Sequence, residues 1–164
     1  MVRNIEDLVI RIPDWKDKIE FSYRVNTRQG FHDSIWNMSL YAFDIPREVQ
    51  VVIDDNDTLH ISVGTPGFVS FDGQFPTGMK LPLKEWIHTH PFGQAYFSAT
   101  DKNTVNIWHS KLNSATVLGK YQKAELRFRY NGEGHHLYTF SERENRWNTV
   151  NRVMETLWHE EEEE

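Results

Sequence analysis

The 164 residues of this chain fit one domain with its own hydrophobic core, and the absence of cysteine excludes disulfides, thiolate metal sites and thiol catalysis. The formal net charge of −6 argues against nucleic acid as the main partner. No apolar run reaches the ~18 residues of a membrane span, and the charged N-terminal segment has no signal-peptide core. We therefore expect a cytoplasmic protein without a membrane partner.

The N-terminal part of the chain is predicted to form two strands and a helix. β-branched and aromatic residues indicate strands over residues 5–12 and 18–25. Apolar residues recur at helical spacing over residues 31–48, where Asp33 or Ser34 can cap the helix.

Short strands are predicted in the middle of the chain. Residues 49–54 (VQVVID) form a continuous apolar run that is typical of a buried strand. Residues 58–64 and 67–73 resemble the two arms of a hairpin, and residues 85–91 (EWIHTHP) are expected to form a strand that enters a loop at Pro91.

The C-terminal half is predicted to contain two helices separated by three strands. The first helix covers residues 98–112, with Ser98 or Thr100 as its N-cap. The expected strands cover residues 115–121, 124–131 and 135–140, the last two joined by a turn at 131–134, and an amphipathic helix follows over 141–160. This mixture predicts an α+β fold with a single domain over residues 1–159 and an acidic tail over 160–164.

Residues 88–101 (HTHPFGQAYFSATD) contain the candidate residues for a metal site. His88 and His90 project from the same face of a strand because side chains alternate with a period of two. Asp101, in the first turn of the next helix, can supply a third ligand and leave a fourth position open, as in catalytic zinc sites. Iron and manganese also accept such ligands. Ser98 lies beside this group, where its hydroxyl can donate to a developing oxyanion.

Each of these residues also has a purely structural interpretation. The two histidines can be structural or solvent-exposed, Ser98 can serve as an N-cap, and Asp101 can supply favourable charge at a helix N-terminus. The combined spacing, H-T-H, seven residues, S, two residues, D, is more specific than its parts.

This spacing, with Pro91 after the second histidine, resembles the signature of the JAMM (MPN-plus) zinc metalloproteases. The resemblance implies a cytidine-deaminase-like, curved mixed β-sheet flanked by helices, with zinc held by His88, His90 and Asp101 and with Ser98 supporting the oxyanion. It also implies zinc-dependent hydrolysis of a peptide or isopeptide bond that removes or processes a ubiquitin-like modifier or tail peptide. The implied partner is a protein or peptide, such as a ubiquitin-like protein with an extended C-terminal tail. The family also occurs in phage tails, so a phage or viral particle is an alternative location, and the sequence defines no oligomeric state.

The family resemblance further implies a glutamate as general base, shortly after a proline and before a buried strand. In "IPREVQVVID" that residue is Glu48, although Val49–Ile53 replaces the glycine–leucine–leucine–glycine type run that commonly follows. A solvated carboxylate at a helix end is the alternative for Glu48, and Glu20 in a predicted strand is the other candidate base.

Two other interpretations compete with this one. The segment "HTHPFGQ" also resembles a cupin motif, with His88, His90, Gln94 and a later histidine such as His136 as ligands. The second alternative is an inactive MPN-type scaffold or binding domain. Phe92, Tyr96 and Phe97 can form a wall against the substrate or pack beneath the loop, and His135 and His136 are expected to be surface residues.

Overall fold

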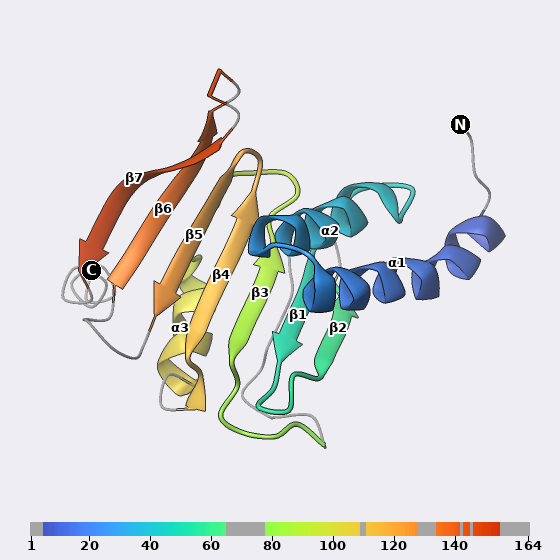
Figure 1. The fold of residues 1–164 in the computed structure, drawn as a ribbon, viewed down its shortest axis with the longest axis horizontal. Helices are drawn as coiled ribbons and strands as arrows, with labels where there is room; N and C mark the ends of the chain where they lie inside the picture. The colour runs from blue at the N-terminus through green and yellow to red at the C-terminus, as the bar shows by residue number, and fades with distance from the viewer. Residues whose placement is uncertain are drawn as a thin grey trace.

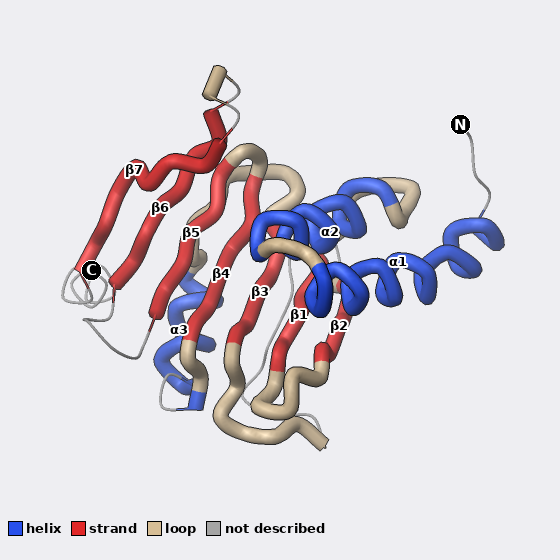
Figure 2. The backbone as a smooth tube through the Cα atoms, viewed as in Figure 1, coloured by secondary structure: helices blue, strands red, loops and turns tan. Residues whose placement is uncertain are grey.

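A seven-stranded mixed sheet forms the centre of the fold, with helices on both of its faces (Figures 1 and 2). The computed structural model describes residues 5–64, 78–108, 111–127, 134–141, 143, 144 and 146–154. The strands are β1 (Val49–Ile53), β2 (Leu59–Val63), β3 (Glu85–Thr89), β4 (Ser114–Gly119), β5 (Gln122–Arg127), β6 (Gly134–Ser141) and β7 (Arg146–Met154). The helices are α1 (Ile5–Val25), α2 (Arg28–Tyr41) and α3 (Ala99–Trp108).

The strand order is β2-β1-β3-β4-β5-β6-β7. β3 and β4 run parallel, whereas all the other neighbouring pairs are antiparallel. The parallel pair is connected through α3, which covers one face of the sheet, while α1 and α2 cover the other (Figure 1). This arrangement confirms the α+β class predicted from the sequence.

α1 corrects the prediction of two strands in the N-terminal segment. Residues 5–25 form one helix, and the buried or partly buried side chains of its described part recur at helical spacing: Trp15, Ile19, Ser22 and Tyr23. The β-branched and aromatic content of this segment suggested strands, but one helical stripe of those residues packs against α2 and the sheet.

β7 corrects the prediction of a C-terminal helix. The apolar residues Trp147, Val150 and Met154 fit a helical stripe, but Arg146–Met154 instead pairs with β6. Trp147, Thr149, Val150 and Val153 all favour strands, and the free edge of β6 offers backbone partners. Residues 155–160 of the expected helix, and the strand expected over 67–73, lie outside the described residues.

The remaining described elements agree in type with the prediction, but α2 covers Arg28–Tyr41 instead of residues 31–48, and α3 covers Ala99–Trp108 instead of residues 98–112. The N-cap of α2 is Thr27, whose hydroxyl accepts a hydrogen bond from the Gly30 N–H at 3.0 Å, so the prediction of Asp33 or Ser34 as the cap was wrong. Asp33 lies within the helix, where its carboxylate accepts a hydrogen bond from Gln29.

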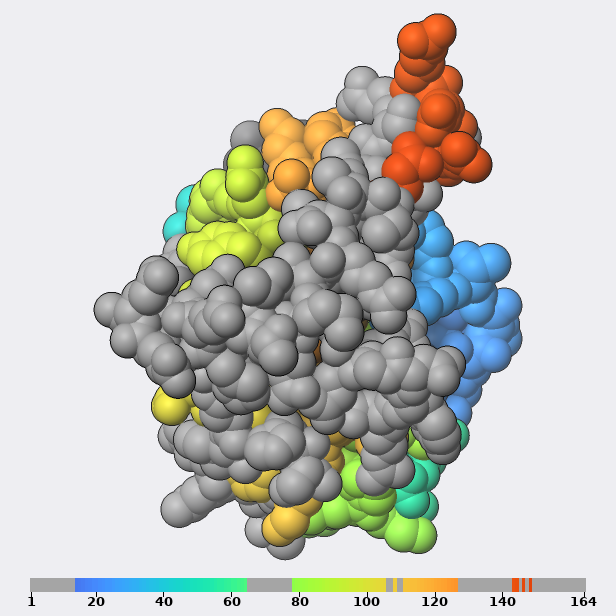
Figure 3. Space-filling model, turned by 90° about the vertical axis from the view of Figure 1, so that its left-hand side faces the viewer, coloured from blue at the N-terminus to red at the C-terminus, as the bar shows by residue number. Residues whose placement is uncertain are grey.

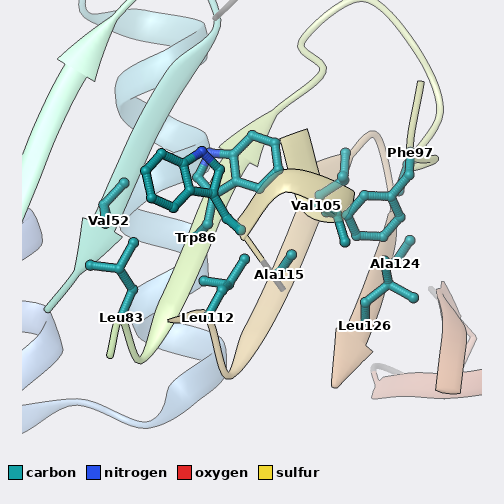
Figure 4. Close-up of a cluster of buried hydrophobic side chains, with 12 residues drawn as sticks. Val52, Leu83, Trp86, Phe97, Val105, Leu112, Ala115, Ala124 and Leu126 are labelled. Carbon is teal, nitrogen blue, oxygen red and sulfur yellow. The ribbon is translucent and has the colours of Figure 1, made fainter. Parts of the chain in front are cut away.

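Two hydrophobic clusters hold the layers together. One packs α3 against the sheet through Trp86, Phe97 and Val105 (Figure 4), and the other packs α1 and α2 against the opposite face. β1 and β3 lie between these layers and are buried along their whole length, as expected of central strands that are covered on both faces. In Figure 3 the blue residues of the α1–α2 layer and the yellow-green segment after β3 lie on opposite sides of the molecule.

Candidate metal centre

β3 directs both histidines of the motif toward α3. His88 lies within the strand and His90 directly follows it, while Thr89 between them faces α2 and contacts Ser39. His88 is only 2% exposed, and its ring stacks on that of Trp86 with the ring centroids 4.7 Å apart. The strand thus fixes the first histidine and places the second at the start of the loop.

The first turn of α3 brings Asp101 to the two histidines. Asp101 Oδ2 lies 3.1 Å from His88 Nε2 and 3.6 Å from His90 Nε2. One ligand atom from each of the three residues lies within 4.8 Å of the others. Two nitrogens and one oxygen at such separations can surround a single ion at the ~2.0–2.2 Å ligand distances of zinc.

Ser98 and Asp101 form a reciprocal cap at the start of α3. The Ser98 N–H donates to Asp101 Oδ2 at 2.9 Å, and the Asp101 N–H donates to Ser98 Oγ at 3.1 Å. Ser98 is therefore the N-cap, one of the two caps predicted, and it also orients the candidate ligand. This capping role does not exclude a role in catalysis, because in these contacts the Ser98 hydroxyl accepts a hydrogen bond and keeps its own hydrogen to donate.

The polar atoms that lack partners at this site fit a metal ion. Although His88 Nε2 is close to Asp101, the two groups are not aligned as a hydrogen bond, and neither ring nitrogen of His88 has a hydrogen-bond partner within the described part of the chain. His90 Nδ1 lies 3.2 Å from the Gln94 carbonyl oxygen. A proton on Nδ1 can be donated to that carbonyl, which leaves the Nε2 lone pair facing Asp101, the tautomer expected of a metal ligand.

Asp101 and His90 each shift the pKa of the other toward the charged form. Burial alone would raise the pKa of Asp101, but the two adjacent histidines outweigh burial and hold that pKa well below its usual range. Burial opposes charge on His90 as well, yet Asp101 and Glu48 raise the pKa of its imidazole. The site therefore keeps an ionised carboxylate beside the His90 imidazole, whose pKa is raised.

Glu48 lies at the rim of the same group. It directly precedes β1, is 5% exposed, and its Oε1 lies 3.8 Å from His90 Nε2, whereas its Oε2 has no hydrogen-bond partner among the described residues. Burial raises the pKa of Glu48 to about 7, an effect that Asp101 reinforces and His90 opposes. A solvated helix-end carboxylate is thus the wrong description of Glu48. Glu20 is exposed on α1, on the other side of the sheet, and the strand predicted around it is part of that helix.

The aromatic residues of the loop between His90 and Asp101 differ in their burial. Phe97 is buried in the cluster beneath α3, as one alternative predicted. Phe92 and Tyr96 are 63% and 55% exposed, and the Tyr96 ring lies edge-on to His90 with the centroids 5.0 Å apart. The exposed Tyr96 ring therefore lies beside the second candidate ligand.

The sequence analysis did not predict the contacts that hold the strand with the two histidines in place. The Thr89 hydroxyl accepts a hydrogen bond from the Val49 N–H at 2.9 Å and lies 2.8 Å from Ser39 Oγ. The Trp86 indole donates to the Gln50 side chain at 2.9 Å. A threonine between two predicted ligands in a buried strand was the available signal, because its hydroxyl needs a partner on the opposite face.

Several other predicted features do not join this site. His136 lies on β6, which β4 and β5 separate from β3, and Gln94 meets His90 through its backbone carbonyl. The open mixed sheet with helices on both faces also differs from the barrel of a cupin. For His135 and His136 the structure describes only the backbone, so their surface position stays a prediction.

Comparison of the chain with models of protein families and with curated proteins gives no match. Within the described residues, no helix is both long and apolar enough to cross a membrane. The interpretation of the site therefore depends on its own geometry and on the motif that the sequence carries.

Proposed function

We propose that this chain is a zinc-dependent hydrolase of peptide or isopeptide bonds that uses His88, His90 and Asp101 as metal ligands. The observation that carries the proposal is the convergence of these three ligands beside the buried carboxylate of Glu48. A metal with three protein ligands and an adjacent buried base is the arrangement of hydrolytic rather than structural zinc sites.

Glu48 and Ser98 would have different roles in the proposed reaction. When bound, zinc would polarise the scissile carbonyl and acidify a water molecule. Glu48 Oε1, 3.8 Å from His90 Nε2, is placed to accept a proton from that water. As the water oxygen bonds to the carbonyl carbon and the C–N bond breaks, Glu48 returns the proton to the leaving amine. The Ser98 hydroxyl donates to the carbonyl oxygen while it carries negative charge.

The proposed substrate is an extended tail, such as that of a ubiquitin-like protein joined to a lysine amine. Support comes from the resemblance of residues 88–101 to the JAMM signature and from the exposed Tyr96 ring beside His90. The edge strand β2 lies next to β1, the strand that Glu48 precedes. Pairing with a sheet edge can hold a flexible peptide through its backbone.

Metal analysis tests the first requirement of the proposal. The purified chain should bind about one zinc ion, because three nitrogen and oxygen ligands form one site. His88→Ala should abolish tight binding, whereas His60→Ala, which alters a histidine paired with Asp54, should retain it. Elemental analysis and titration with zinc measure both, and a wild-type chain that takes up no zinc would refute the site.

Cleavage tests the second requirement. The probe is a ubiquitin-like protein joined through its C-terminal tail to the lysine of a fluorescent peptide, and release of the peptide is followed with the zinc-loaded chain. Zinc-dependent release supports the hydrolase. A chain that binds one zinc and the tail but cleaves neither isopeptide nor linear peptide bonds would instead be an MPN-type binding scaffold.

A further inference from the structure

A second candidate site lies on the opposite face of the sheet from the metal centre. A cavity of about 570 Å³ opens between α2 and the β4–β5 hairpin, and Arg146 of β7 also lines it. Its wall includes Leu118, which belongs to the hydrophobic cluster under α1 and α2, whereas His88 and Asp101 lie on the α3 face. The sheet therefore separates this cavity from the candidate metal ligands, and its volume is in the ~300–1,000 Å³ range of small-molecule sites.

α2 contributes one continuous stripe to the cavity. Gln29, His32, Asp33 and Trp36 have the spacing i, i+3, i+4 and i+7, so they share one helical face. The hairpin faces them with Tyr121 and Lys123, among others. The walls thus combine two aromatic side chains with hydrogen-bonding and positively charged groups.

His32 is the unusual member of this wall. It is 2% exposed, and neither of its ring nitrogens has a hydrogen-bond partner among the described residues. Burial lowers the pKa of His32 well below its ordinary value, and Arg28 and Lys123 add to the effect, so the ring is neutral and offers one donor and one acceptor. Buried polar groups in proteins are normally satisfied, so two unpartnered nitrogens in the wall of a cavity indicate a site for a ligand.

The charged side chains that line the cavity are two positive groups, Lys123 and Arg146, and one negative group, Asp33, whose carboxylate already accepts a hydrogen bond from Gln29 at 2.7 Å. Arg146 lies at an exposed position, where it pairs with Glu144 at 3.1 Å. Lys123 is buried, and the nearby Glu125 carboxylate favours its positive charge while burial opposes it. Trp36 and Tyr121 provide the aromatic surface against which a planar ring can pack.

We infer that the cavity between α2 and the β4–β5 hairpin binds a small organic anion with an aromatic ring, recognised by His32 and Lys123. The ring packs against Trp36 or Tyr121, the anionic group lies toward Lys123, and a polar atom of the ligand bonds to the His32 imidazole. This site is independent of the proposed hydrolase activity, because it uses none of the residues of the metal centre.

The test uses indole-3-carboxylate as the probe and indole-3-carboxamide as its neutral match. Binding to the full chain is followed by NMR through the side-chain nitrogen signals of His32 and through contacts between probe and His32 ring protons. We expect saturable binding of the carboxylate with a shift of the His32 signals, and at least about tenfold weaker binding of the carboxamide, which lacks the charge that Lys123 attracts. His32→Phe and Lys123→Met should each weaken carboxylate binding by at least about tenfold.

A carboxylate can also bind a metal, so the titration is repeated with His88→Ala, which should leave binding in the cavity unchanged. Binding that disappears in His88→Ala but survives both cavity variants would assign the probe to the metal centre and overturn the proposal. So would the absence of any change in the His32 signals of the wild-type chain at millimolar probe. The wild-type signals decide the question even if a cavity variant fails to fold.

Discussion

Two groups of buried polar side chains, one on each face of the sheet, are satisfied to very different degrees. On the α2 face, Arg28 donates to both oxygens of Glu85, at 3.1 and 2.7 Å, and to Glu125 at 2.7 Å. The Thr116 hydroxyl donates to the same Glu85 carboxylate at 2.7 Å. This network joins the first turn of α2 to β3, β4 and β5, and its described contacts satisfy every oxygen of Glu85.

On the α3 face the buried polar atoms lack such partners. Both ring nitrogens of His88 and Oε2 of Glu48 have no hydrogen-bond partner among the described residues, although Asp101 lies close by. Fold-stabilising charges are normally paired because an unpaired buried charge is costly. The contrast indicates that the network around Arg28 serves the fold, whereas the group around His88 leaves buried atoms that a ligand could satisfy, a property it shares with His32 elsewhere on the α2 face.

The largest expected effect is on turnover at the α3 face. Glu48→Gln keeps the size of the side chain and its hydrogen bonding but cannot accept a proton, so turnover should fall about 10²–10⁴-fold. Zinc content and melting temperature should stay near those of the wild type, because Glu48 is not among the three ligands. Peptide release, elemental analysis and thermal denaturation of the same preparation measure these quantities, and full activity in this variant would remove Glu48 from the mechanism.

A stability effect of comparable free energy is expected from the α2 face. Arg28→Ala leaves two buried carboxylates without their shared partner, which should lower the free energy of unfolding by about 3–5 kcal/mol. Urea denaturation measures the loss. The free energy of unfolding of Arg28→Lys should lie between those of Arg28→Ala and the wild type, because lysine keeps the charge but loses the bidentate geometry. Zinc bound per folded chain should not change, so a loss of zinc affinity in folded Arg28→Ala would contradict the separation of the two faces.

Ser98→Ala should have a smaller effect that distinguishes capping from catalysis. If the hydroxyl supports the oxyanion, turnover falls about 10²–10³-fold while zinc is retained. Loss of the cap alone costs about 1 kcal/mol of stability and leaves turnover near normal. Thr27→Ala is the matched control, since it removes the N-cap of α2 on the other face and should lower only the melting temperature. Equal turnover in the two variants would make Ser98 a cap and nothing more.

The grouping of His88, His90 and Asp101 could be predicted from the sequence because its geometry is local. The period of two in a strand puts His88 and His90 on one face, and Asp101 follows within one loop at a helix start. Glu48 is different, because it is 40 residues away from His88 and approaches it only through the pairing of β1 with β3, where Gln50 lies opposite His88. The family resemblance, rather than any local pattern, identified that residue.

Elements at the two ends of the chain could not be predicted because their local signals conflict with their tertiary surroundings. Residues 18–25 contain Ile19, Phe21, Tyr23 and Val25, whose alternation resembles a strand, yet only part of that set is buried against α2 and the sheet. Trp147, Val150 and Met154 fit a helical stripe, yet the edge of β6 binds them as a strand. In the sequence, no second candidate metal ligand lies at a suitable spacing from His32. Only the packing of α2 shows that its ring lines a cavity.

Glu125 links the α2-face network to pH. Burial alone would raise the pKa of Glu125, but Arg28 outweighs burial and holds that pKa below its ordinary value. A carboxylate whose pKa is lower in the folded state contributes stability above its unfolded pKa of about 4.3 and loses it as the pH falls through the folded pKa. The free energy of unfolding should therefore decrease on acidification below about pH 4.3, in part through this group.

Removing Arg28 should weaken that dependence. Glu125 would then face Glu85 and Lys123, and with its main partner gone the effect of burial would raise its pKa toward or above the unfolded value. Acidification would in that case remove less stability from Arg28→Ala than from the wild type, because protonation would relieve the cost of burying a charge. Urea denaturation of both proteins between about pH 3 and pH 6 gives the two slopes, to which the carboxylates that do not contact Arg28 contribute alike. Parallel curves would mean that Arg28 does not set the pKa of Glu125, and that this part of the acid sensitivity does not come from their ion pair.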